Sequence, residues 1–223
     1  MTETIKRKIR TGIGVRTGIS RRLMLCVLLV LVLAVACVCV FLVLASAKKA
    51  RLYPPHEIAV KVCAYHLVDK IEEALSYSLD RPDKDNYIRA LMTGREHYEH
   101  LEYKLGPIEI RENENLNEAN RVVVPNISMK VKNRSTGEII TQPREGIPKI
   151  AETVLEKRDT PEGPQWYVLT GKQSTGIVST WLNLPRKKVP RSPTIILKKE
   201  DNSVIMQIIF NGKVTDKSIV YLE

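Results

Sequence analysis

An apolar run without a single charged residue extends from Leu23 to Ala47 of this 223-residue chain. As an α-helix, which rises roughly 1.5 Å per residue, the run is long enough to cross a hydrocarbon core of roughly 30 Å. No later apolar run in the sequence approaches this length. The sequence therefore predicts one membrane-spanning helix over residues 23–47, between a basic tail of residues 1–22 and a linker of residues 48–56.

The two flanks of this run carry different numbers of positive charges. Seven basic residues and one acidic residue precede Leu23, so the tail contributes +6 of the net charge of +10. Only Lys48, Lys49 and Arg51 follow the run closely. The positive-inside rule predicts a cytoplasmic N-terminus, a tail beside the anionic headgroups of the lipid bilayer, and an exported domain in the periplasm, a lumen or the cell exterior.

A cleaved signal peptide is an alternative interpretation of the same run. Ala45-Ser46-Ala47 fits the A-x-A pattern of a signal-peptidase site. The segment from Ala34 to Cys37 resembles a lipidation box, but cleavage there would leave an apolar stub of residues 38–47. Because the run greatly exceeds the roughly 7–15 apolar residues of a signal peptide, we expect it to stay in the membrane as a signal anchor.

The exported part, residues 57–223, is predicted to begin with helices, over residues 57–104. An apolar stripe predicts the first helix, from residue 57 to residue 79. Its members recur at the helical spacings of three and four residues: Val60, Ala64, Leu67, Val68, Ile71, Leu75 and Leu79. A second helix is expected from Asp83 to Gly94, and a third from Arg95 to Lys104.

After a polar loop over residues 111–120, the apolar pattern changes to a period of two, which predicts a β-rich part over residues 121–223. The expected strands are 121–124, 127–132, 138–141, 151–157, 165–170, 176–184, 194–199, 203–210 and 218–222. The predicted fold class is therefore α+β, with two or three helices packed on one face of a curved, mainly antiparallel sheet.

This order of elements, with the aromatic-centred late strand Gln165-Trp166-Tyr167-Val168, resembles the cone-shaped NTF2-like folds. The resemblance is one of pattern and implies a curved sheet closed by helices. Some membrane-anchored members of that fold class serve as components of envelope assemblies. A fold alone does not set a function, so the residues must carry that argument.

The densest group of titratable residues is Glu96, His97 and His100. On the expected third helix the two histidines share a face, and with Glu96 they form a weak candidate metal site. The spacing does not match H-E-x-x-H or H-x-x-E-H, so a solvated helix face is the interpretation that we favour. We predict no metal, no other cofactor and no catalytic residue. His66 projects away from the apolar stripe and is predicted to lie on the surface.

A basic segment over residues 185–193 contains Arg186, Lys187, Lys188 and Arg191 among three prolines. Proline favours an extended backbone, so we predict a loop that displays these four cations to an acidic partner or to anionic headgroups. A solvated loop without a partner is the alternative. A nucleic-acid partner is not expected, because the exported part lacks a basic face interleaved with aromatic residues.

Three of the four cysteines, Cys26, Cys37 and Cys39, lie in the apolar run, and only Cys63 lies outside it. The exported part therefore has no intrachain disulfide framework. We expect Cys63 to be a partly buried thiol, with a disulfide-linked homodimer as the alternative.

Together these features predict a single-pass, non-enzymatic scaffold or assembly component that docks other membrane or envelope proteins through its exported domain. One alternative is a membrane-tethered ligand-binding or sensing domain with an apolar pocket. Another is a tethered enzyme, for which a metal at His97 and His100 would be the distinguishing feature. An exposed strand edge would favour the first function, and an apolar cavity the second.

Overall fold

The chain divides into two units, Met1–Lys48 and Lys49–Glu223, each of which is described by itself. The computed structural model describes residues 21–47, 50–79, 84–143, 152–169, 184–201 and 203–222. The basic tail up to residue 20 and nearly all of the expected strand over residues 176–184 lie outside these ranges.

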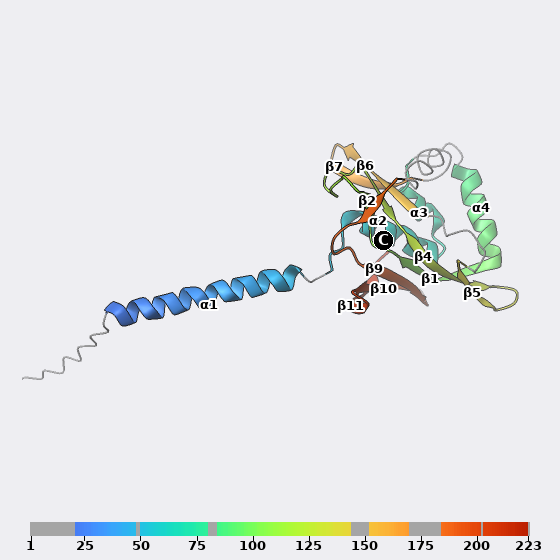
Figure 1. Ribbon diagram of the computed structural model, residues 1–223. Coiled ribbons are helices and arrows are strands. Elements are labelled where there is room, and N and C mark those ends of the chain that lie inside the picture. The colour runs from blue at the N-terminus through green and yellow to red at the C-terminus, as the bar shows by residue number, and fades with distance from the viewer. Residues whose placement is uncertain are drawn as a thin grey trace, which may run out of the picture. The chain divides into compact units, whose positions relative to one another are not determined.

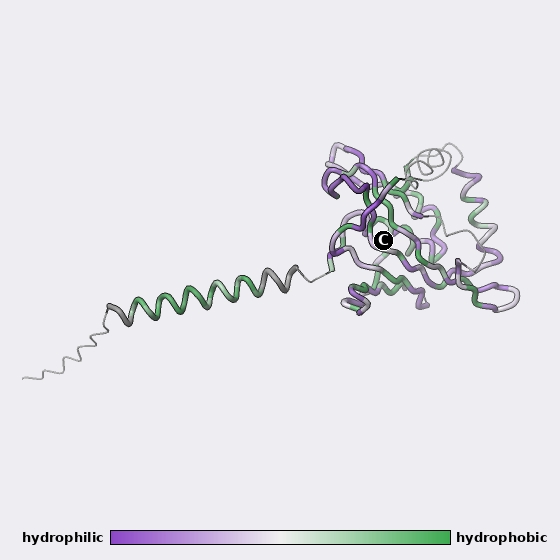
Figure 2. The backbone as a smooth tube through the Cα atoms, viewed as in Figure 1, coloured by the Kyte–Doolittle hydropathy of each residue, from purple (hydrophilic) through white to green (hydrophobic). Residues whose placement is uncertain are grey.

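Helix α1 (Arg21–Ala47) is the described element of the first unit. It is the one helix among the described residues that is long and apolar enough to cross a membrane. Every side chain from Met24 to Phe41 is exposed, and Figure 2 shows hydrophobic colouring along successive turns of the helix. The expected apolar helix is thus confirmed, and within the described residues its apolar surface has no protein cover.

The expected helix over residues 57–79 is present as two helices, α2 (Pro54–Leu67) and α3 (Ile71–Ser76). The break falls at Asp69, whose φ of 62° is incompatible with a continuing right-handed helix. The predicted apolar stripe is nevertheless the buried face, since Ala64 and Leu67 are fully buried. The stripe therefore predicted which face is buried, but not where the helix ends.

The second expected helix is α4 (Lys84–His97), but the third expected helix, from Arg95 to Lys104, is wrong. The chain leaves α4 at His97 and continues directly as strand β1 (Tyr98–Leu105). This strand lies inside a sheet, where it pairs on both sides and buries Tyr103 and Leu105. Pairing and burial in the sheet outweigh the local helical preference of this segment.

The described strands form two antiparallel sheets where the sequence predicted one curved sheet. The six-stranded sheet has the order β11-β10-β9-β1-β4-β5, and the five-stranded sheet has the order β7-β6-β3-β2-β8. The α+β class is confirmed, but the NTF2-like arrangement is not. The remaining strands are β2 (Glu109–Arg111), β3 (Arg121–Val124), β4 (Asn126–Asn133), β5 (Ile139–Gln142), β6 (Thr153–Thr160), β7 (Gly163–Val168), β8 (Arg186–Lys188), β9 (Thr194–Glu200), β10 (Ser203–Phe210) and β11 (Lys213–Val220).

Helix α2 contacts both sheets: β1 and β9 in the six-stranded sheet, and β3 and β7 in the five-stranded sheet. Figure 1 shows α2 between the strands β6 and β7 on one side and β9 and β10 on the other. Nine of its residues, from Pro55 to Leu67, are buried. The core of the C-terminal unit is therefore built around α2.

The chain passes between the two sheets at Gly106 and at Pro125, where β1 leads into β2 and β3 leads into β4. The Gly106 N–H donates to the Pro125 carbonyl at 2.7 Å. A Cβ at position 106 would lie 3.3 Å from the Pro125 side chain, which explains the glycine at this close approach. The fully buried His56 at the start of α2 bonds the Gly106 carbonyl through Nε2 at 3.1 Å, which fastens the helix to this corner.

Candidate functional site

A pocket of about 290 Å³ lies between α4 and the strands β1, β4 and β5. In the sheet, Tyr103 pairs with Met129 and Leu197, so these side chains share the face that α2 covers. At the C-terminal end of α2, the same face is open beneath α4, and Tyr103, Met129 and Val131 line the pocket there. Tyr87, Leu91 and Arg95 line it from α4. The lining is mostly apolar, with a few polar groups that converge from α2, α4 and β1.

Arg95 is the one buried residue of α4, and it is only 8% exposed. Its Nη2 lies 3.4 Å from Nδ1 of His66, and its Nε lies 3.6 Å from an oxygen of Asp69. Both distances exceed those of a good charge-assisted hydrogen bond. Nη1 is closed to solvent and has no hydrogen-bond partner among the described residues. The guanidinium also interacts with the Tyr103 hydroxyl, which is uncharged. The buried cation therefore has neutral partners and one distant carboxylate, which compensate its charge incompletely.

Two histidines beside Arg95 are held in the neutral form. Burial and then the Arg95 charge lower the pKa of His66 to about 4. Burial and then the Arg95 charge lower the pKa of His100 to about 3. Burial also raises the pKa of Tyr103, whose hydroxyl lies 2.6 Å from Nδ1 of His100 and is therefore placed to donate to it. At neutral pH Arg95 is the one full positive charge among the described residues that line the pocket.

The candidate metal group does not assemble. Glu96 and His97 end α4 with exposed side chains, whereas His100 lies on β1 and lines the pocket. The expected shared helical face is therefore absent because the helix ends at His97. No group of three metal-ligating side chains occurs in the described part of the chain. The surface position expected for His66 is also wrong, because this side chain lines the pocket.

Sequence reasoning missed Arg95 and His66 as members of one site. A signal for Arg95 was present, since it follows Leu91 by four residues and so continues the apolar face of α4. A charged residue in such a stripe is unusual unless the charge has a partner or a ligand. No spacing in the sequence brings His66 and His100 to the same place, because one lies on α2 and the other on β1.

The basic segment is a strand and a turn, and not the freely displayed loop that the sequence predicted. Arg186 lies on β8 and forms ion pairs with Glu109 at 3.3 Å and Glu152 at 3.2 Å, with its side chain 17% exposed. Lys187 and Lys188, also on β8, and Arg191 in the following turn are exposed, as expected. The predicted display of four cations is therefore wrong for Arg186, whose charge is used inside the domain.

The turn after β8 is held against the first residues of the C-terminal unit. The Arg51 N–H donates to the Arg191 carbonyl at 3.0 Å, and the Tyr53 hydroxyl donates to the Pro190 carbonyl at 2.9 Å. The exposed cations of this segment consequently lie where the chain enters the domain.

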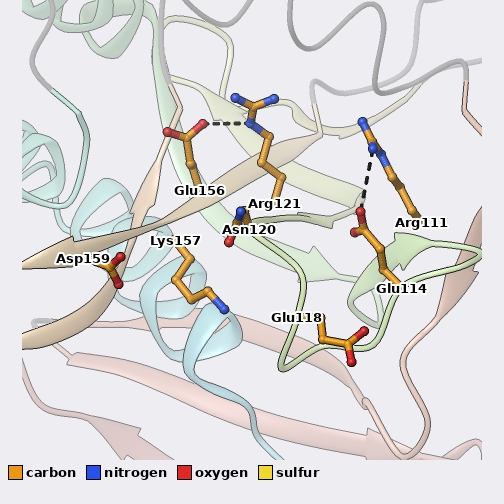
Figure 3. Close-up of a pocket in the computed structure, with 8 residues that line it drawn as sticks. All are labelled: Arg111, Glu114, Glu118, Asn120, Arg121, Glu156, Lys157 and Asp159. Carbon is orange, nitrogen blue, oxygen red and sulfur yellow. Dashed lines mark hydrogen bonds and ion pairs between the residues drawn. The ribbon is translucent and has the colours of Figure 1, made fainter.

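A second hollow, of about 440 Å³, is lined by charges of both signs, shown in Figure 3. Arg121 Nε donates to Glu156 at 2.7 Å, and Arg111 lies 3.7 Å from Glu114. Burial opposes ionisation of Glu156, but hydrogen bonds from Arg121 and Arg158 outweigh it and lower its pKa. These charges compensate one another, so among the described residues this hollow, which we call the charged cleft, has no single uncompensated charge for a ligand comparable to that of Arg95.

One edge of the six-stranded sheet carries exposed apolar side chains. Strand β11 pairs with β10 on one side, and nothing in the described part of the chain pairs with its other side. Val214 is 58% exposed and Ile219 is 48% exposed. Val214 lies opposite Ile209 of β10, and Ile219 lies opposite Ile205, which is only 8% exposed. The polar pair of Gln207 and Lys217 lies between these two apolar pairs. Tyr221, just after the strand, is 83% exposed.

Cys63 is buried on α2, and burial raises the pKa of its thiol to about 12. The expected buried thiol is confirmed. A disulfide to a second copy would require α2 to leave its place between the sheets.

No protein family model, curated protein or solved structure matches this chain.

Proposed function

We propose that this protein is a single-pass membrane-anchored docking component that recruits a partner protein to the exported side of a membrane through strand β11. Helix α1 is the proposed anchor, because a helix that is apolar on all sides and exposed along Met24–Phe41 is stable in lipid but not in water. The basic excess before α1 supports a cytoplasmic N-terminus. We propose no catalytic role for the domain.

The open edge of β11 is the observation that carries the proposal. An edge strand presents main-chain donors and acceptors to any extended segment that can pair with it. The exposed side chains of Val214 and Ile219 give such a segment two apolar contacts, one near each end of the strand. The Lys217 N–H donates to the Asp216 carboxylate at 2.8 Å, a contact that an added strand would displace.

We propose a different protein as the occupant, and not a second copy of this chain. Suppose that two copies of β11 pair antiparallel about a two-fold axis normal to the sheet. Each side chain then stays on its own face of the joint sheet, so the numbers of two residues that lie opposite each other differ by an even number. The two registers that align nearly the whole strand then place Lys217 opposite Lys217, or Asp216 opposite Asp216. Like charges directly opposite each other destabilise a strand pair.

The exposed cations Lys187, Lys188 and Arg191 are a second proposed contact. They lie beside Arg51 and Tyr53, where the chain enters the domain. Because Arg51 follows the proposed anchor by only a few residues of sequence, we propose anionic headgroups as the partner of these cations, with each cation contributing about 1 kcal/mol near such a surface.

The test is site-specific photo-crosslinking of the full-length protein in its native membrane, with the crosslinker at position 217. We expect one protein adduct, which the double substitution Val214→Glu with Ile219→Glu abolishes. The matched control is Ile139→Glu, because Ile139 is 61% exposed on β5, the opposite edge strand of the same sheet. A crosslinker at position 187 is expected to give lipid adducts.

All three substituted side chains are exposed, so we expect each variant to melt like the wild type. An adduct at position 217 that persists in the double variant would overturn the docking proposal. If Ile139→Glu abolishes the adduct as well, the partner does not distinguish the β11 edge from the β5 edge, which would also contradict the docking proposal. An adduct of twice the chain mass that contains only this protein would favour self-association.

A further inference from the structure

We propose that the pocket beneath α4 binds a small organic monoanion, whose acidic group pairs with the guanidinium of Arg95 and whose apolar part rests on Leu91 and Met129. This site lies on the inner face of the six-stranded sheet, away from the β11 edge. The proposal is therefore independent of the docking function.

The first step is the charge balance at Arg95. Its nearest carboxylate, Asp69, lies 3.6 Å from Nε and is shared with Arg134, whose Nη2 is also 3.6 Å away. The Asp69 side chain is 37% exposed, so water weakens its interaction with the buried guanidinium. Burying a charge without a close counter-ion is costly, and an anion in the pocket would reduce this cost.

The second step is the state of the other polar groups. His66 accepts from Arg95 through Nδ1, so as a neutral ring it carries its proton on Nε2. His100 accepts from Tyr103 in the same way. Both imidazoles are therefore N–H donors that add no second full charge. One guanidinium with neutral donors around it matches a singly charged carboxylate better than a phosphate dianion.

The third step is size and lining. An apolar cavity of about 150 Å³ holds a benzene molecule, so a pocket of about 290 Å³ suits an aromatic or short-chain carboxylic acid. Leu91, Met129, Val131 and the tyrosines supply apolar surface for such a ligand. A purely inorganic anion would leave this surface uncovered.

The fourth step is access. Nη1 of Arg95 is closed to solvent, so the ligand must displace atoms around it. Helix α4 buries none of its side chains except Arg95, and Met92 is 56% exposed. A small shift of α4 would therefore uncover Nη1 to a ligand in the pocket without exposing the core around α2.

The experiment measures melting of the full-length protein in detergent, with benzoate and hexanoate as probes. We expect the melting temperature to rise with the concentration of either acid, and to stay constant with benzyl alcohol or with inorganic phosphate. Arg95→Gln is expected to weaken the response at least tenfold. Arg111→Gln, in the charged cleft of Figure 3, is the matched control and is expected to keep the response.

If Arg95→Gln does not fold, Met129→Trp fills the pocket from the sheet side and is expected to abolish the response without removing the cation. No response to either acid at millimolar concentration in the wild type would overturn the proposal. A response equally reduced by Arg111→Gln would indicate a general effect of charge, and an equal response to phosphate would indicate inorganic anion binding. Either result would also overturn it.

Discussion

Three histidines sit neutral inside the C-terminal domain, and they predict that it loses stability in mild acid. Burial lowers the pKa of His56 and His66 to about 4 and that of His100 to about 3, from an ordinary value of 6.5. Below pH 6.5 the unfolded chain therefore binds more protons than the folded one. The stabilisation is complete above about pH 6.5 and is lost as the pH falls toward 4, at up to about 1.4 kcal/mol per pH unit for each histidine.

Urea unfolding between pH 7.5 and pH 5 measures this dependence. His56→Gln keeps a donor toward the Gly106 carbonyl and removes one titrating group, so we expect a slope smaller by about one proton. A free energy of unfolding that stays constant from pH 7.5 to pH 5 would show that the rings are not held neutral.

Individual residues also show why the candidate site was only partly predictable from the sequence. Arg186 was expected to be displayed because prolines surround it, but its partners Glu109 and Glu152 are distant in sequence and reach it only through the sheet. Lys187 points to the other face of β8, and both Lys187 and Lys188 remain exposed. The identity of a buried charge depends on tertiary partners, which local sequence does not contain.

At the scale of elements, α2 is predicted to be the segment on which folding of the C-terminal domain depends. Leu67 and Val60 face the core, and a carboxylate at either position would be buried without a partner. We expect Leu67→Asp and Val60→Asp to abolish cooperative melting. Lys61→Asp places the same charge on the exposed side of α2 and is expected to fold. Normal yield and melting of Leu67→Asp would contradict the assignment of this helix as central to the core.

The elements also show where periodicity succeeds and where it fails. The buried stripe on α2 was predictable because apolar residues that recur over a long segment at spacings of three and four share one face of a helix but not one face of a strand. The segment after His97 is shorter, and its pattern is ambiguous between helix and strand. Only pairing with β4 and β9, which come much later in the chain, determines that it is a strand. The apolar stripe continues on both sides of Asp69, so it does not indicate that the helix breaks there.

At the scale of the whole molecule, one sheet was expected and two were found. Most strands from β3 onward were predicted, whereas β1, β2 and β8 were not, and β11 was predicted only in its last part. The strands β1 and β2, and likewise β3 and β4, follow each other across corners at Gly106 and Pro125. Alternation within a strand indicates which side chains are buried, and it does not indicate which sheet the strand joins. The architecture thus depends on the two corners and on α2 between the sheets.

Orientation in the membrane is the prediction that belongs to the whole chain. The tail has seven basic residues against three shortly after the apolar run, and this difference is expected to hold the N-terminus in the cytoplasm. In sealed vesicles, protease should digest the C-terminal domain only when the exported face is outside. The intact mass should include residues 23–47, which a cleaved signal peptide would have removed.

Replacing Lys6, Arg7, Lys8, Arg10 and Arg16 by glutamine leaves two basic residues before the run and three after it, so the bias disappears. We expect a mixed population, with part of the C-terminal domain protected on each side. Lys6→Arg with Lys8→Arg keeps every charge and should keep the wild-type orientation, because the rule depends on charge and not on side-chain identity. A uniform, unchanged orientation in the glutamine variant would mean that another part of the chain determines the topology, and the charge argument for an exported domain would then fail.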